Sequence, residues 1–190
     1  IGGRVSRLRT FITFRNEFQF DTDDSKGYFT LKLTPRKQRS YVVEVVDDPL
    51  GKVTETTTDV TTGGVTTTTT ELKTQRRLVI SAMFDQRMGE RLGVHGGLME
   101  NTAGIGVDYR PADFMTLLFD AWDFNSVRAR HDSPHLKATA RLSLGPYFFV
   151  QGGMDNFLND DFITPFAGAG LTFEDEDLKY LLGTAASALN

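Results

Sequence analysis

The chain has 190 residues, of which 39% are hydrophobic, a formal net charge of -4 at pH 7 and no cysteine. This length suits one domain, and the missing cysteine excludes a disulfide framework and a thiolate metal site. The charge gives no argument for nucleic-acid binding. No apolar run approaches the roughly 18 residues of a membrane helix, so the chain can cross a membrane only as a closed barrel. It begins at Ile1 rather than Met, which indicates a fragment or a processed chain.

Most of the chain alternates apolar and polar residues with a period of two, which predicts strands with one apolar face. In the first segment, for example, Ile12 and Phe14 fall on one face, and Thr13 and Arg15 fall on the other. About ten strands are expected, one in each of the ranges 4–20, 28–34, 41–47 with its extension, the returning 72–84, 91–99, 102–110, 114–123, 135–143, 147–153 and 163–173.

A Thr-rich piece interrupts this pattern between the third and fourth strands. Residues 54–70 contain eleven Thr around Gly63-Gly64. Thr favours strands, and Gly-Gly permits the positive φ of a hairpin turn, so 51–72 is predicted to form a long hairpin that projects past the fold. A disordered Thr-rich loop is the alternative. Asp47-Asp48-Pro49 is expected to bend or bulge the third strand, because Pro cannot donate to a ladder.

These features predict an all-β fold: an antiparallel up-and-down transmembrane barrel of about ten strands over residues 1–174. An even strand count puts both termini on one side, with short turns there and longer loops opposite, as in outer-membrane barrels. Alternation alone does not say which face points outward. Gly and charged residues on the polar face favour a narrow polar lumen. The candidate lumen charges are Arg7, Arg9, Arg15, Glu17, Lys32, Glu44, Asp108, Arg110, Asp120, Lys137 and Arg141.

Aromatic residues near the strand ends also favour an apolar outer face, since membrane interfaces select aromatic girdles. The candidate girdle consists of Phe84, Tyr109, Phe114, Tyr147 and Trp122. The last strand resembles the terminal strand by which outer-membrane barrels are recognised for insertion. Its candidate seam and insertion residues are Gly168, Gly170, Leu171 and Phe173.

No catalytic set emerges from the sequence. The histidines are His95, His131 and His135, and a zinc site needs three or four converging ligands. The Asp- and Asn-rich loop over 155–161 is better explained by Asx turns than by cation binding. We therefore expect a protein that is not an enzyme and that needs neither a metal nor another cofactor.

The tail, residues 175–190, changes period. Acidic residues begin it and apolar ones follow, which predicts a short periplasmic helix whose Leu178, Leu181 and Leu182 seek a surface.

Several segments resemble, in the same order, the C-terminal region of certain MlaD-like proteins of the mammalian cell entry (MCE) family of Gram-negative bacteria. They cover residues 45–57, 96–109, 134–137, 150–159 and 166–183. The resemblance implies the outer-membrane end of an MCE-type system that moves lipids between the inner and outer membranes. It implies membrane lipids and other subunits of such an assembly as partners. The even strand count and the short turns on the side of the termini predict that both termini lie in the periplasm.

Two alternatives stay open. One is a stand-alone outer-membrane barrel that acts as a small channel, an adhesin or a receptor, with the Thr-rich hairpin as its exposed part. The other is a soluble barrel that binds an apolar ligand, which requires the apolar faces inside.

Overall fold

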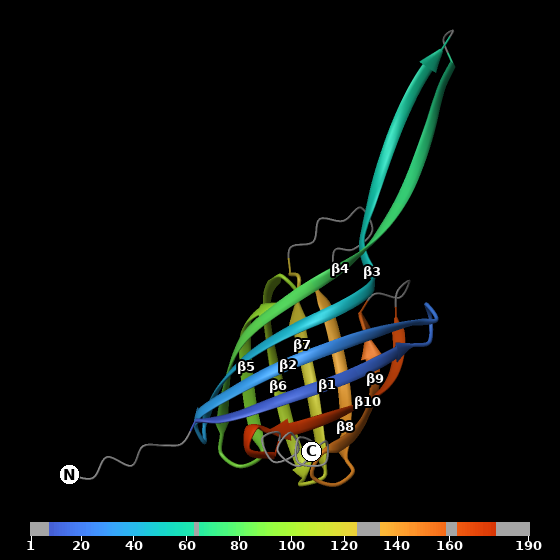
Figure 1. Ribbon diagram of the computed structural model, residues 1–190. Helices are drawn as coiled ribbons and strands as arrows, with labels where there is room; N and C mark the ends of the chain where they lie inside the picture. Colours follow the sequence, from blue (N-terminus) through green and yellow to red (C-terminus); the bar gives the residue numbers. More distant parts are fainter. Residues whose placement is uncertain (1–7, 63–64, 125–133, 159–162, 178–190) are drawn as a thin grey trace, which may run out of the picture.

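The computed structural model describes residues 8–62, 65–124, 134–158 and 163–177. Ten antiparallel strands close into one barrel in the order β1-β10-β9-β8-β7-β6-β5-β4-β3-β2 (Figure 1). The strands are β1 (Arg9–Gln19), β2 (Asp24–Arg36), β3 (Arg39–Thr62), β4 (Val65–Met88), β5 (Leu92–Met99), β6 (Thr102–Ala112), β7 (Met115–Trp122), β8 (His135–Ser143), β9 (Phe148–Asp155) and β10 (Thr164–Glu174). The predicted all-β antiparallel barrel of ten strands is therefore confirmed. No helix among the described residues is long and apolar enough to span a membrane.

The barrel closes where the first and last strands meet. β1 and β10 form a continuous ladder of nine residue pairs, from Phe11↔Glu174 to Gln19↔Phe166. Because the strand number is even and every neighbour is antiparallel, β1 begins and β10 ends at the same end of the barrel. The closing seam is as regular as the other ladders.

Strands β3 and β4 extend beyond the barrel as a hairpin, which we call the arm (Figure 1). β3 pairs with β2 only as far as Asp47↔Gly27, and β4 pairs with β5 only from Ala82 onward. Beyond these points the two strands pair with each other alone, out to Thr62↔Val65. The register shifts between Asp48 and Lys52, where Pro49 cannot donate a ladder hydrogen bond.

The two faces of the wall differ in polarity. Apolar side chains that face outward stay exposed, for example Phe14 (51%), Ile105 (58%) and Phe119 (52%). Inward positions hold buried polar side chains such as Glu17 and Gln151. The division follows from the two-residue period of a strand, which sends successive side chains to opposite faces. The barrel thus has an apolar outer surface and a polar interior.

A small apolar group shares this interior with the charges. It consists of the buried residues Tyr28, Val46, Val79, Met99, Trp122, Phe149 and Phe166. Asp175–Asp177 begin a helical turn after β10. The three leucines of the predicted tail helix lie outside the described residues.

Candidate functional site

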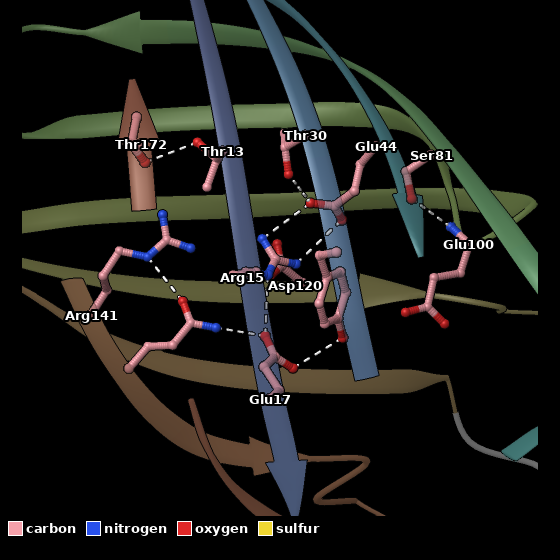
Figure 2. A network of polar contacts seen from close by, with 12 residues as sticks. Thr13, Arg15, Glu17, Thr30, Glu44, Ser81, Glu100, Asp120, Arg141 and Thr172 are labelled. Atoms are coloured by element: carbon pink, nitrogen blue, oxygen red, sulfur yellow. Dashed lines mark hydrogen bonds and ion pairs between the residues drawn. The ribbon is translucent and has the colours of Figure 1, made fainter. Parts of the chain in front are cut away.

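The polar interior is organised around the Glu17 carboxylate on β1, which is 1% exposed. Its Oε2 accepts hydrogen bonds from Tyr28 Oη at 3.0 Å and Lys137 Nζ at 2.5 Å. Its Oε1 accepts one from Gln151 Nε2 at 2.6 Å and lies 3.3 Å from Arg15 Nε. A buried carboxylate is tolerated when it is both paired and hydrogen-bonded, and Glu17 meets both conditions (Figure 2).

Arg15 links this centre to a second carboxylate. Its guanidinium contacts Glu44, with Nη1 3.1 Å from Oε2, and lies 3.8 Å above the ring of Tyr28. Glu44 Oε2 also accepts a hydrogen bond of 2.6 Å from Thr30. The adjacent strands β1, β2 and β3 therefore share one network, which Lys137 of β8 and Gln151 of β9 extend through the interior.

Four further charge pairs of the described residues line the rest of the interior. They are Lys32–Asp85 at 2.5 Å, Arg87–Asp108, His95–Asp120 at 2.7 Å and His135–Asp155 at 2.5 Å. The two pairs that contain a histidine are ion pairs only when the imidazole is protonated. Trp122 stacks on the His135 ring with the ring centroids 4.1 Å apart.

The space left between these side chains is small. The cavity has a volume of about 70 Å³. Its charged lining residues are Arg15, Glu17, Glu44, Glu100, Asp120, Lys137 and Arg141, and eight further residues, among them Leu118 and Trp122, complete the lining. Drug-sized ligands occupy pockets of about 300–1,000 Å³. This cavity holds a few waters or a small solute, and an acyl chain does not fit in it.

The predicted lumen charges fall into three groups. Eight of them face inward: Arg15, Glu17, Lys32, Glu44, Asp108, Asp120, Lys137 and Arg141. Arg9 and Arg110 lie at the barrel rim, with side chains 56% and 49% exposed. Arg9 Nε binds Glu174 Oε1 at 2.6 Å across the seam, and Arg7 lies outside the described residues.

Several interior residues were missed by the sequence analysis. Asp85 and Arg87 follow the predicted end of the strand 72–84, but β4 continues to Met88. Extending the two-residue period past Phe84 would have placed both side chains inward. Alternation also places Tyr28 inward, opposite Phe29, but it does not show which side chains of other strands face Tyr28, Gln151 and Asp155, and their hydrogen-bonding roles depend on those partners.

The predicted aromatic girdle needs one correction. Phe84, Tyr109, Phe114 and Tyr147 are exposed by 41–61% on the outer wall. Trp122 is only 6% exposed, because its position in β7 points inward, where it stacks on His135. It belongs to the interior and cannot contribute to an outer girdle.

The seam glycines are required by close packing. A Cβ on Gly168 would lie 2.2 Å from the backbone oxygen of Asn16, and one on Gly170 would lie 2.3 Å from the Phe149 ring. Leu171 is 42% exposed on the outer face, and the Phe173 ring stacks on Tyr147 at 5.8 Å. These residues close the wall and leave no lateral gap in the nine-pair ladder.

Candidate metal sites were weighed on the sequence, but among the described residues no group of three His, Asp or Glu could hold a metal ion. His131 and the segment 159–161 of the acidic loop lie outside those residues.

Fold and site together define a closed, ten-stranded antiparallel β-barrel with a charge-paired interior and an apolar wall. A family model described as a lipocalin-like domain matches residues 10–180, and the chain belongs to this lipocalin-like family. It is 34% identical over 185 residues to an uncharacterized protein of Aquifex aeolicus (strain VF5). The match covers 96% of this chain and 56% of the relative, so the chain spans about half the length of that relative. No solved structure matches the chain significantly.

The predicted MCE membership is wrong, since the matching family is lipocalin-like and the relative is an uncharacterized protein. MCE-type lipid transport is therefore not supported, and the predicted MCE subunits lose the resemblance from which they were inferred. Most of the segments that carried the resemblance are alternating strands rich in Gly, such as 96–109 and 166–173. Unrelated antiparallel barrels share this pattern, because it reflects only which face of each strand is apolar.

Proposed function

We propose that this domain is a stand-alone membrane barrel that rests its apolar wall against lipid and displays the arm. The observation that carries the proposal is that the outer wall is apolar and the interior polar, the reverse of a soluble ligand-binding barrel. Twenty-six large hydrophobic side chains of the described residues are exposed, whereas ion pairs fill the interior. In water each half-exposed aromatic or aliphatic side chain forgoes on the order of 1 kcal/mol of burial, and lipid contact recovers it.

The dimensions of the wall are compatible with this proposal. Strands β5 to β10 contain 8–11 residues each, and a tilted membrane strand needs about 9–11. A closed barrel also leaves no unpaired backbone edge inside hydrocarbon. Aromatic side chains such as Tyr109 and Tyr147 are exposed on the wall, as at membrane interfaces.

For the location, we propose the outer membrane of a Gram-negative bacterium. Barrels of this type have an even number of strands and both termini in the periplasm. With that orientation the arm projects from the outer surface, since it leaves the barrel at the end opposite the start of β1 (Figure 1). Membrane lipids are then the partners of the wall.

The small lumen favours an anchoring and binding role over an open channel. Ion pairs such as Lys137–Glu17 cross the interior, and the cavity measures about 70 Å³. The arm is then the part that meets other molecules, as in an adhesin or a receptor. We propose no catalytic activity for the domain.

The family description favours a second candidate, a soluble barrel that binds an apolar ligand. Lipocalin barrels hold one small ligand inside, and the lipocalin-like family model covers residues 10–180. This candidate function requires an apolar binding site for the ligand. The interior cavity is small, and most of the residues that line it are polar or charged, so the ligand would have to bind elsewhere on the barrel or widen the interior.

One experiment separates the two candidates. The full chain is purified with and without detergent, and its migration on a semi-native gel is compared before and after boiling. The membrane proposal expects aggregation without detergent and a heat-modifiable band after refolding into vesicles. A monomer that stays soluble without detergent and carries bound lipid would overturn that proposal and support the lipocalin-type alternative.

A further inference from the structure

Arg141 on β8 differs from the other inward cations whose contacts are described. Arg15, Lys32, Arg87 and Lys137 each pair with a carboxylate. Among the described residues no carboxylate lies within the 4.0 Å ion-pair distance of the Arg141 guanidinium. Arg141 therefore brings a positive charge into the lumen without a direct counter-charge, although an unpaired buried charge is costly.

Neutral groups fix the position of this guanidinium. Its Nε donates a hydrogen bond of 3.0 Å to Gln151 Oε1, and its Cζ lies 4.4 Å from the centroid of the Phe149 ring. Gln151 in turn donates to Glu17, so its amide oxygen is turned toward Arg141. Figure 2 shows the two terminal nitrogens of Arg141 without an interaction to any residue drawn.

The carboxylates around the cavity do not pair directly with Arg141. Glu17 and Glu44 form ion pairs with Lys137 and Arg15. Asp120 is bound by His95 at 2.7 Å. Glu100 also lines the cavity, and burial raises its pKa, which disfavours its charged form. Arg141 is thus the cation of this lining without a direct ion-pair partner.

The cavity limits what can neutralise Arg141. Arg141 lines the space of about 70 Å³ together with Leu118 and Thr139, which leaves room for an ion of one to a few heavy atoms and some water. A single guanidinium without a direct ion-pair partner matches a singly charged ion, and it offers two parallel N–H donors to a halide or a carboxylate.

We infer that the barrel interior binds a small, singly charged anion, a chloride or a formate-sized carboxylate, on the terminal nitrogens of Arg141. The site is independent of whether the outer wall faces lipid or water. It makes the anion a structural counter-ion of the lumen, so anion binding stabilises the closed barrel.

The test compares anions at constant ionic strength on the full chain, folded in detergent micelles or in buffer as its solubility requires. Sodium chloride and sodium formate are compared with sodium gluconate, whose anion is too large for the cavity. At ten times its Kd, chloride or formate should raise the unfolding midpoint by about 3–5 °C over gluconate. Which of the two acts at lower concentration distinguishes the halide from the carboxylate.

Arg141→Gln should abolish this shift, and Arg141→Lys should retain part of it. Arg39→Gln is the matched control, because it removes one positive charge outside the lumen, where Arg39 binds Gln86, and it should keep the full shift. Line broadening of chloride in ³⁵Cl NMR, reversed by formate, provides a readout on the unmutated protein. Equal midpoints in all three salts without chloride broadening, or a shift that survives Arg141→Gln, would overturn the inference.

Discussion

The substitution Phe119→Arg tests whether the outer wall faces lipid or water, because it should lower the stability of the barrel strongly in lipid and hardly at all in water. Phe119 lies near the middle of β7, is 52% exposed on the outer face, and has Val107 and Ala138 as its ladder neighbours. Arg at the midplane of a lipid-facing strand costs about 2–4 kcal/mol. Losing the buried half of the Phe side chain adds about 1 kcal/mol, so we expect a destabilisation of roughly 3–5 kcal/mol in vesicles.

In water the same substitution replaces an exposed aromatic ring by a solvated charge. Surface substitutions of this kind usually change the free energy of unfolding by no more than about 0.5 kcal/mol, so a soluble barrel should tolerate Phe119→Arg or gain solubility. The free energy is measured by denaturant titration of the refolded chain in short-chain lipid vesicles.

Phe114→Arg is the matched control, since Phe114 is 61% exposed but precedes the first residue of β7. Near the membrane interface the cost of Arg falls to about 0–1 kcal/mol. The membrane argument fails if both variants lose the same free energy, or if Phe119→Arg is as stable as the unmodified chain and stays soluble without lipid.

Three further predictions address the interior, the seam and the rim. Glu17→Gln should cost about 3–5 kcal/mol, because it leaves Lys137 uncompensated, and Glu17→Gln with Lys137→Met should recover part of it in denaturant titrations; equal losses would argue against coupling. Gly170→Ala should lower the folded yield on heat-modifiability gels, since its Cβ would meet the Phe149 ring, whereas the outward Ala169→Val should fold; normal folding of Gly170→Ala contradicts the packing argument. At the rim, the hydrogen bond from Arg9 lowers the pKa of Glu174 from its ordinary value of 4.5, so the pair stabilises the barrel above that value and loses this contribution as pH falls through the lowered pKa. The stability difference between the unmodified chain and Glu174→Gln should therefore be constant near pH 7 and shrink in acid, and a difference that grows in acid would refute the sign.

The barrel was predictable because alternation is a local property of each strand. Phe14 and Arg15, or Leu171 and Thr172, reveal opposite faces without knowledge of any partner strand. Turn residues then separate the strands, and the even count fixes the relative position of the strand ends. The same logic identified eight inward charges, including Glu17 and Lys137.

Pairings across the lumen were not predictable in the same way. Glu17 and Lys137 are 120 positions apart, and only barrel closure brings them together. Trp122 shows the related limit: its position near a strand end suggested an interface, but the direction of its side chain follows the two-residue period and not the depth along the strand. Strand ends are also poorly marked, as the continuation of β4 to Met88 shows.

Membership in a lipocalin-like family and an apolar outer wall concern different properties of the chain. Family and topology describe the order and pairing of strands, which hydrogen bonds between backbones determine. Which face is apolar depends on the phase of the alternation, and a shift of one residue exchanges the two faces of a strand. Here Phe14, Phe29 and Phe119 are outside, while Glu17 and Arg15 are inside. The environment of this barrel therefore has to be inferred from its side chains, and a substitution on the wall tests it more directly than any likeness of fold.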